Sequence, residues 1–355
     1  MDSRQRARQS IGRMSGKAGA GPRNLITDVP GIRVGQAEDA AARTGVTVIL
    51  PDQPAVAACD VRGGAPGTRE TDALQPENLV DHVHAVVLSG GSVYGLAAAD
   101  AVAVALGARG IGFHLAPGSA APPSPVVPTA ILFDLANGGN KAWGDEPPYR
   151  ALARAALAAA GEEVALGTAG AGYGARAGGL KGGAGSASAV TADGIIVGAI
   201  VAVNAAGSVV APGSRAFWAA PFEVDGEFGA LGPAALAAAP DDWAEDRLAA
   251  LTLRNTTIAC VATNVALTPG QAKRVAIMAQ DGIARAIRPA HGPSDGDVVF
   301  VLSTGQLPPP EPANFTLART GALAADCLAR AIARGVYAAT AWPGDGPPAW
   351  RSLPA

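Results

Sequence analysis

The sequence predicts an α/β fold in which stacked β-sheets are covered by helices on both faces. Hydrophobic residues make up 49% of the 355 residues and charged residues only 16%, which is enough for a large buried core. Glycine is abundant (46 residues) and aromatic residues are few (5%), which favours tight turns and close packing of sheet against helix. Apolar runs of strand length are followed by long helical patterns at both ends of the chain, as expected for sheets that are buried under helices.

In the N-terminal half, short apolar or β-branched runs that stop at turn residues predict strands. These runs cover residues 25–29 and 32–35 around a Pro-Gly turn, and then 45–50, 55–61, 84–88 and 129–134. One helix is predicted from Val93 to Leu106, ended by Gly107. A second helix starts near Pro147 and ends at Gly161, because proline is favoured in the first turn of a helix.

In the C-terminal half, strands are predicted at residues 186–190, 194–203, 257–265 and 297–302. A helix starts at Thr268, with Gln271 completing a capping box, and its apolar spacing continues to Pro289. A second amphipathic helix covers residues 317–334 and ends at Gly335. Residues 212–254, by contrast, are rich in Ala, Pro and Gly without a sustained period. A loop of this length is usually functional or disordered, and its position before Thr256 suggests a processing linker.

Charge and cysteine content exclude several classes of function. The formal net charge of −3 predicts no general attraction to nucleic acid or to an anionic membrane. Cys59, Cys260 and Cys327 are odd in number and far apart, which gives no disulfide framework and no metal spacing and fits a reducing, cytoplasmic setting. Residues 1–23 carry six basic residues and no apolar core, so we expect a disordered basic tail before a single domain at residues 24–345.

The dipeptide Asn255-Thr256 is the strongest indication of chemistry, because it opens an apolar strand directly after the predicted linker. If the bond before Thr256 breaks, the threonine gains a free α-amine beside its own hydroxyl. An α-amine has a reference pKa of roughly 7.7–8.0 and can take the hydroxyl proton near neutral pH, so that one residue supplies both nucleophile and base. The alternative interpretation is an ordinary polar pair at the start of a buried strand.

Two further polar residues stand near glycine-rich or apolar segments. Lys181 lies in a glycine-rich segment, residues 167–188, that lacks the Gly-Lys-Ser/Thr ending of a phosphate-binding loop and is better interpreted as a pocket wall. It either holds charge near a reacting carbonyl or amine, or is a solvated surface lysine. Asn204 follows an apolar strand, where its amide can donate to a developing oxyanion or simply begin a turn.

Asp295-Gly296-Asp297 directly precedes a predicted strand, and its two carboxylates can orient an ammonium or a hydroxyl, although a plain acidic turn has the same pattern. The run offers too few oxygen ligands for calcium. His82 and His84 have no evident third metal ligand, so we interpret them as strand-edge histidines. Ser89-Gly90-Gly91-Ser92 lacks the Gly-x-Ser-x-Gly form, which leaves little support for a serine-triad hydrolase.

In combination, these segments resemble the family of D-aminopeptidases and β-peptidyl aminopeptidases (the DmpA family), which includes the nylon-oligomer hydrolases. The resemblance spans roughly residues 24–337 and rests on several motifs together. The matching segments are Thr27 to Gly35, Ser89 to Leu96, Lys181 to Ser188, Asn255 to Ile258 and Asp295 to Asp297. The resemblance implies a four-layer α-β-β-α sandwich that cuts itself between residues 255 and 256 into two chains that stay together.

The resemblance also implies roles for individual residues. Thr256 matches the nucleophile, Asn204 the asparagine of the oxyanion site, and Lys181 the site lysine of the nylon-oligomer branch. Asp295 and Asp297 match the pair that contacts the amine and the hydroxyl of the nucleophile. Asn-Thr and Asp-Gly-Asp lean toward the nylon-oligomer branch, because the aminopeptidase branch usually has Gly-Ser and Ser-Gly-Glu at these places.

The expected substrate pocket includes Phe133, Tyr94 and Gly91. Phe133 departs from the nylon-oligomer hydrolases, which have a site tyrosine at that position. The missing hydroxyl weakens the case for a nylon-like substrate and leaves the cleavage chemistry intact.

We therefore expect a self-processing amide hydrolase, with fragments of 255 and 100 residues, that acts on short peptides or peptide-like amides. No metal and no organic cofactor is expected. The alternatives are a 6-aminohexanoate (nylon) oligomer endohydrolase, an acyl or aminoacyl transferase like the ornithine acetyltransferases, and a non-catalytic binder of small molecules. The expected partners are the substrate and the protein's own fragment, without nucleic acid or membrane, and the resemblance suggests a tetramer of cleaved pairs.

Overall fold

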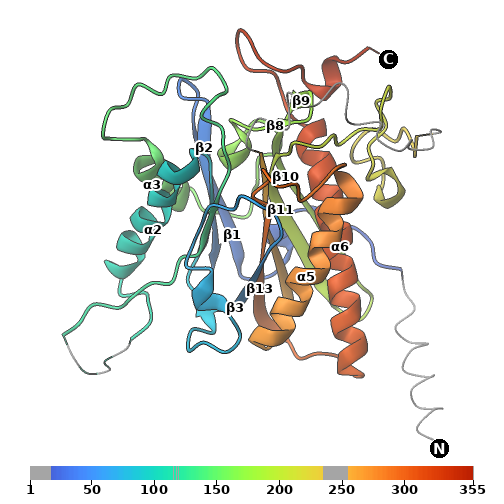
Figure 1. Cartoon of the computed structure of the whole chain (residues 1–355). Helices are drawn as coiled ribbons and strands as arrows, with labels where there is room; N and C mark the ends of the chain where they lie inside the picture. Colours follow the sequence, from blue (N-terminus) through green and yellow to red (C-terminus); the bar gives the residue numbers. More distant parts are fainter. Residues whose placement is uncertain (1–16, 115, 117, 119, 235–254, 355) are drawn as a thin grey trace, which may run out of the picture.

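Two stacked β-sheets form the centre of the protein, with one layer of helices outside each sheet, in the computed structural model (Figure 1). The structure describes residues 17–114, 116, 118, 120–234 and 255–354. Helices α2 (Ala97–Gly107) and α3 (Tyr149–Ala158) pack on the five-stranded sheet. Helices α5 (Pro269–Ala286) and α6 (Ala313–Tyr337) pack on the six-stranded sheet. This arrangement confirms the predicted α-β-β-α sandwich.

Both sheets are mixed. The five-stranded sheet has the order β1-β2-β6-β7-β4, and only its β6–β7 pair is parallel. Its strands are β1 (Ile32–Asp39), β2 (Thr44–Pro51), β4 (Thr68–Arg69), β6 (Val86–Ser89) and β7 (Thr129–Ile131). The six-stranded sheet has the order β10-β11-β12-β13-β3-β5, and only its β12–β13 pair is parallel. Its strands are β3 (Ala55–Val61), β5 (His82–Val83), β10 (Gly183–Val190), β11 (Ile196–Asn204), β12 (Thr256–Val265) and β13 (Val298–Leu307).

The core on either side of the six-stranded sheet follows the two-residue repeat of its strands. In β12, Ile258 and Cys260 pack toward the five-stranded sheet, whereas Ala259 and Val261 pack toward α5 and α6. All ten residues of β12 are buried. Because both faces of this strand are covered, its sequence is apolar without interruption from Ile258 to Ala262.

Glycine allows the helices to touch the sheets. A Cβ on Gly185 of β10 would lie 1.8 Å from the carbonyl oxygen of Ala331 in α6, so no larger residue fits there. Gly335 belongs to the same contact, because a Cβ on it would lie 2.9 Å from the amide nitrogen of Gly185. The prediction that Gly335 ends the helix was wrong: it lies within α6, which runs to Tyr337.

Other differences from the predicted elements have local causes. The strand expected at residues 25–29 contains a 3₁₀ helix, η1 (Ile26–Asp28), whose Asp28 carboxylate accepts from the Leu25 amide. The strand expected at residues 84–88 starts only at Val86, and the His84 amide before it donates to the Val126 carbonyl. The helix expected from Val93 begins as a 3₁₀ helix, η3 (Ser92–Leu96), before α2. The two-residue strands β4, β8 (Arg176–Ala177) and β9 (Leu180–Lys181) have no signal in the sequence pattern.

Two predicted segments lie wholly or partly outside the described residues. Most of the predicted basic tail and residues 235–254 of the predicted linker belong to this group. Within the described part, contacts begin before Asn24, because Gly19 pairs with Val190 of β10. None of the helices in the described ranges is long and apolar enough to cross a membrane.

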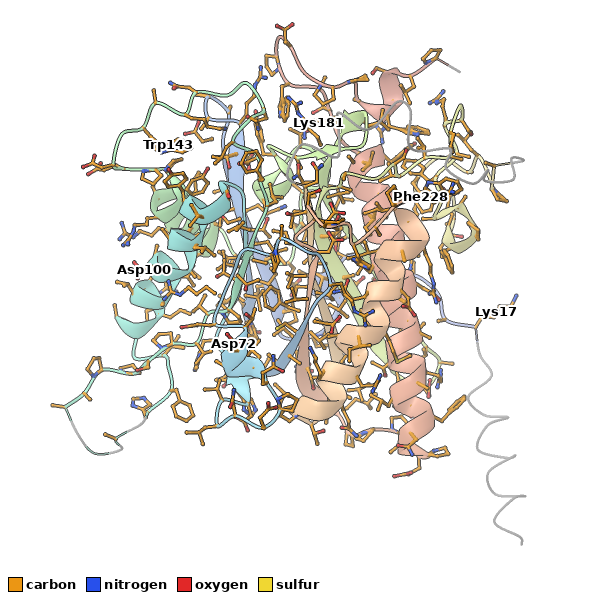
Figure 2. All side chains as sticks on the ribbon, viewed as in Figure 1. Lys17, Asp72, Asp100, Trp143, Lys181 and Phe228 are labelled. Carbon is orange, nitrogen blue, oxygen red and sulfur yellow. The ribbon has the colours of Figure 1, made fainter. Side chains whose placement is uncertain are left out.

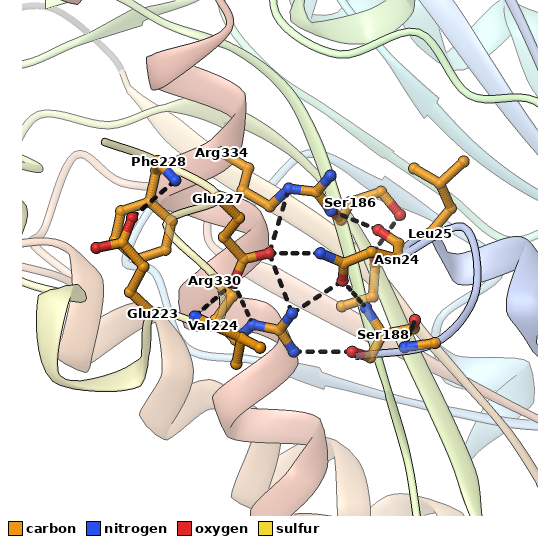
Figure 3. A network of polar contacts seen from close by, with 12 residues as sticks. Asn24, Leu25, Ser186, Ser188, Glu223, Val224, Glu227, Phe228, Arg330 and Arg334 are labelled. Carbon is orange, nitrogen blue, oxygen red and sulfur yellow. Dashed lines mark hydrogen bonds and ion pairs between the residues drawn. The ribbon is translucent and has the colours of Figure 1, made fainter. Parts of the chain in front are cut away.

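A buried polar network connects the segment before the linker with α6 (Figure 3). The Glu227 carboxylate accepts from Arg330 Nε at 2.5 Å and from Arg330 Nη2 at 3.0 Å, and it lies 3.4 Å from Arg334 Nε. Asn24 Nδ2 donates to the same carboxylate at 2.6 Å. The Glu227 and Arg330 side chains are only 7% and 4% exposed. The network therefore binds residues that precede Asn255 to a helix that follows it.

We predict that Glu227→Gln lowers the free energy of unfolding by about 3–5 kcal/mol, because the substitution leaves Arg330 buried without its charge partner. Asp52→Asn is the matched control, since it breaks an ion pair with Arg33 whose side chains are 45% and 52% exposed. The control should change stability by less than about 1 kcal/mol. Urea unfolding in a Thr256→Ala background, which is designed to keep the chain in one piece, measures both values. Equal, small effects would contradict the role of the network.

Candidate active site

Thr256 is the first residue of β12, and strands on both sides bring polar residues to it. On the antiparallel side, Asn204 at the end of β11 lies directly opposite Thr256. On the parallel side, Asn255 forms a bridge with Asp295, just before β13 begins. Because β12 and β13 start at the same edge of the sheet, the Asp295-Gly296-Asp297 run lies beside the Asn255–Thr256 bond.

The Asn255 carbonyl oxygen accepts two hydrogen bonds. Thr256 Oγ1 donates to it at 2.5 Å, and the Gly296 amide donates at 3.0 Å. Thr256 is 4% exposed, so this contact is shielded from solvent. A Cβ on Gly296 would lie 2.9 Å from Thr256 Oγ1, which means that a glycine permits this close approach. The hydroxyl, the carbonyl and a backbone donor thus meet at one peptide bond.

Asp297 uses both of its carboxylate oxygens. Oδ1 accepts from the Thr257 amide at 2.7 Å. Oδ2 accepts from the His291 amide at 3.1 Å and lies 2.8 Å from His291 Nδ1. A carboxylate oxygen can accept from this ring nitrogen only when Nδ1 carries the proton. Sequence reasoning missed His291, and the only available signal was a histidine four residues before Asp295.

Asp295 is less completely bonded. Its Oδ2 accepts from the Gly292 amide at 2.8 Å, whereas its Oδ1 is buried and has no hydrogen-bond partner of normal geometry among the described residues. The Ala206 backbone lies near enough to this carboxyl group to lower its pKa slightly. Burial, together with the neighbouring charge of Asp297, raises the pKa of Asp295 to about 6. The two carboxylates therefore differ, since one is fully hydrogen-bonded and the other is held near its titration point at neutral pH.

Asn204 is oriented by backbone groups on both sides of its amide. Its Oδ1 accepts from the Arg176 amide at 3.0 Å, and its Nδ2 donates to the Phe133 carbonyl at 3.2 Å. This pattern fixes which end of the amide carries the hydrogens. Asn204 and Asn255 both line a small pocket, so the Asn204 amide is close to the place where an oxyanion from this peptide bond would form.

Lys181, which is labelled in Figure 2, is completely buried, and this excludes the solvated surface lysine as an interpretation. Its Nζ donates to the carbonyls of Gly172, Ala175 and Gly182 at 3.3, 3.1 and 2.7 Å. Nζ also lies 4.8 Å from the centre of the Trp342 ring. Desolvation lowers the pKa of Lys181 to about 7. Among the described residues, Nζ donates to these backbone groups and not to Thr256.

The pocket beside the Asn255–Thr256 bond brings together residues from four distant segments. Its lining consists of Phe133, Asp134, Ala136, Asn137, Gly174, Arg176, Asn204 and Asn255. Of the residues expected in the pocket, Phe133 lines it. Gly91 lies behind the lining, where its amide donates to Asp134 Oδ1 at 2.8 Å. Tyr94 is 48% exposed and packs edge-to-face on Trp143, outside this lining.

The remaining candidates do not join this site. His82 lies 2.6 Å from Asp81, and His84 Nδ1 accepts from the Val126 amide at 3.0 Å. Among the described residues, no group of three or more His, Cys, Asp or Glu side chains could hold a metal ion. Ser89 Oγ donates to the carbonyl of the next residue, Gly90. A larger cavity, lined by Arg33, His84 and Arg109 among others, includes none of Thr256, Lys181, Asn204, Asp295 and Asp297 in its lining.

Comparisons with known proteins identify the family of the chain. The model of peptidase family S58 matches residues 24–347. An uncharacterized aminopeptidase of Mycobacterium tuberculosis is 46% identical over 348 residues, which cover 93% of this chain and 98% of that protein. A 6-aminohexanoate-oligomer endohydrolase of Kocuria sp. is 31% identical over 294 residues, which cover 81% of this chain and 77% of that enzyme.

Among solved structures, a β-aminopeptidase of Burkholderia sp. is similar with a TM-score of 0.66 and 25% sequence identity, over 93% of this chain and 91% of that one. The match therefore includes both sheets and both helical layers. Together with the family match, which contains every candidate site residue, it makes the chain a hydrolase of peptide or linear amide bonds that belongs to peptidase family S58.

Proposed function

We propose that the protein cuts its own Asn255–Thr256 bond and then uses Thr256 as an N-terminal nucleophile against short peptides or peptide-like amides. The observation that carries this proposal is the 2.5 Å contact between Thr256 Oγ1 and the Asn255 carbonyl oxygen, which also accepts from the Gly296 amide. The proposed nucleophile and a donor for the oxyanion therefore both contact the Asn255 carbonyl group.

In the processing step, Thr256 Oγ1 attacks the Asn255 carbonyl carbon and gives up its proton. The C–N bond then breaks, the nitrogen leaves as the protonated or neutral α-amine of Thr256, and an ester joins Asn255 to the threonine oxygen. Water hydrolyses this ester to a carboxylate on Asn255 and a free hydroxyl on Thr256. The Gly296 amide stabilises negative charge on the carbonyl oxygen in both addition steps.

The uncut chain needs a base other than the α-amine, because the nitrogen of Thr256 is still part of an amide. We assign this role to Asp295, whose Oδ1 has no hydrogen-bond partner among the described residues and whose pKa is raised to about 6. Asp297 is occupied by Thr257 and His291 and orients the start of β12. After cleavage the α-amine itself becomes the base, and both carboxylates orient it.

In the mature enzyme, Thr256 attacks the substrate carbonyl, forms an acyl-enzyme and releases an amine. Asn204 donates to the oxyanion, and Lys181 adds positive charge near the pocket wall. The relatives named as aminopeptidases favour short peptides as substrates of this chain. Hydrolysis of 6-aminohexanoate oligomers is the second candidate, because of the endohydrolase relative, although Phe133 supplies no hydroxyl at the pocket.

We also propose a location and an assembly for the protein. The three cysteines are free and buried, in keeping with a cytoplasmic protein. We propose that the two fragments stay together and that cleaved pairs assemble into a homo-oligomer. Size-exclusion chromatography with light scattering measures this assembly.

The central prediction concerns Thr256→Ala. Wild type should give fragments of 255 and 100 residues on denaturing gels and by intact mass, whereas Thr256→Ala should remain one chain of 355 residues and lose amidase activity by at least about 10³-fold. Thr257→Val is the matched control: its hydroxyl is buried without a hydrogen-bond partner in the described residues, so processing should continue. An active wild type that stays uncut would overturn the proposal.

A second prediction concerns pH. The rate of processing should rise as the pH increases through about 6, because Asp295 must be ionised to accept the hydroxyl proton. Asp295→Asn should slow processing by roughly 10²-fold or more and remove this rise. Refolding the precursor at pH 5 to 8 and following fragment formation on gels measures the rate. Asp81→Asn, at an exposed carboxylate beside His82, should keep the wild-type profile. An unchanged profile in Asp295→Asn would contradict the assignment.

A further inference from the structure

Three cationic side chains surround the ring of Trp342 at the candidate site. The Arg43 and Arg176 guanidinium carbons lie 5.0 and 5.8 Å from the ring centre, and Lys181 Nζ lies 4.8 Å from it. The ring is held in place, because its Nε1 donates to the Tyr173 carbonyl at 2.8 Å. A positive cluster of this kind is unfavourable unless its charges find partners.

Two of the three cations are already bonded. Arg43 donates to the carbonyls of Asn137, Pro343 and Asp345, and Lys181 donates to three carbonyls of its own neighbourhood. Arg176 differs, since its Nε is buried and has no hydrogen-bond partner among the described residues. Among the residues that the structure describes, none of these three cationic side chains forms a salt bridge with a carboxylate.

Asp134, the carboxylate that lines the same pocket, is already hydrogen-bonded elsewhere and does not neutralise Arg176. Asp134 is 2% exposed, and its two oxygens accept from Thr44 Oγ1 at 2.6 Å and from the Gly91 amide at 2.8 Å. Burial also raises its pKa and weakens its charge. Arg176 lines this pocket and is more exposed than Asp134. The charge that the pocket offers to a ligand is therefore positive.

The position of Asn255 indicates which side of the scissile bond lies beside Arg176. In the proposed self-cleavage Asn255 is the acyl component, and it lines the same pocket as Arg176. The acyl component of a substrate that replaces it would lie in the same place. A guanidinium with free donors binds a carboxylate through two parallel hydrogen bonds, which gives both charge and geometric selectivity.

We propose that Arg176 is a specificity-determining residue that binds a carboxylate carried by the acyl component of the substrate, so that the preferred substrates are acidic acyl amides such as glutamyl or aspartyl amides. The proposal rests on the proposed function, because it places the substrate carbonyl at Thr256. Trp342 keeps the guanidinium at the pocket by covering its face.

The experiment compares glutamyl and glutaminyl p-nitroanilides, whose side chains have nearly the same shape but differ in charge and in one acceptor oxygen. Wild type should show at least about a tenfold higher kcat/KM for the glutamyl substrate, as expected for a charge-assisted hydrogen bond. Arg176→Gln should bring the ratio close to one, and Arg176→Lys should keep a ratio of a few-fold, since it retains charge without the paired donors. Equal rates in wild type, or an unchanged ratio in Arg176→Gln, would overturn the proposal.

Arg215→Gln is the matched control. Arg215 also has a buried Nε without a hydrogen-bond partner in the described residues, and its guanidinium carbon lies 4.4 Å from the centre of the Trp350 ring. It does not line the pocket of Asn204 and Asn255. This variant should therefore keep the wild-type ratio. A loss of preference in Arg215→Gln as well would assign the effect to general destabilisation and would count against the proposal.

A binding measurement separates this proposal from the proposed function. Glutarate should raise the melting temperature of the wild-type protein more than glutaramide does at equal concentration, and Arg176→Gln should abolish this difference. The result does not depend on turnover. If no amide is hydrolysed but the glutarate effect is present and requires Arg176, the proposed function fails while the carboxylate site stands. If glutarate acts equally on wild type and Arg176→Gln, the carboxylate site fails.

Discussion

The pairing of β12 with strands on both of its sides is the constraint on which the rest of the site depends. The strand is buried along its whole length, so its register is determined by two ladders and by the packing of both faces. Its first residue is Thr256, and the ladders therefore bring Asn204 and the Asp295–Asp297 run to one peptide bond. Thr256 and Asn204 lie on strands, and the Asp295–Asp297 run directly precedes one, which suits a reaction that needs accurate alignment.

At this site, residues of the same type differ in their hydrogen bonding and therefore in their chemical properties. Asp297 has both oxygens engaged, whereas Asp295 keeps one oxygen without a partner among the described residues and has a raised pKa. The two nearby arginines differ in the same way, since Arg43 donates to carbonyls, whereas Arg176 Nε has no hydrogen-bond partner in the described residues. In each pair, the less bonded member is the one that can respond to a reacting group or a ligand.

The fold class and the longer elements could be predicted from the sequence, because hydrophobic period and capping residues are local signals. The capping box at Thr268 is an example, and the structure has the same cap. Gly335 misled the prediction because its reason for being glycine is a contact with Gly185, which is distant in the chain. Short strands such as β8 and β9 lack any period to detect.

The site residues also differ in whether a local sequence signal identifies them. Thr256 and the Asp-Gly-Asp run stand in recognisable sequence contexts, and Asn204 ends an apolar run. Lys181 could not be assigned from the sequence alone, because its burial depends on Trp342 and Pro348 from the end of the chain. His291 and Arg176 carry no local pattern, since their importance arises from contacts with Asp297 and with the pocket.

The strand order of the six-stranded sheet has a consequence for the lifetime of the processed protein. In the order β10-β11-β12-β13-β3-β5, the two strands that follow Thr256 lie between strands that precede it. After the proposed cut at residue 255, neither piece would hold the complete six-stranded sheet, so reassembly from separated pieces would be a second-order encounter between two incomplete chains. Each unfolding event would then be close to irreversible in dilute solution. The durability of the mature form would be governed by its unfolding rate, and not by a folding equilibrium.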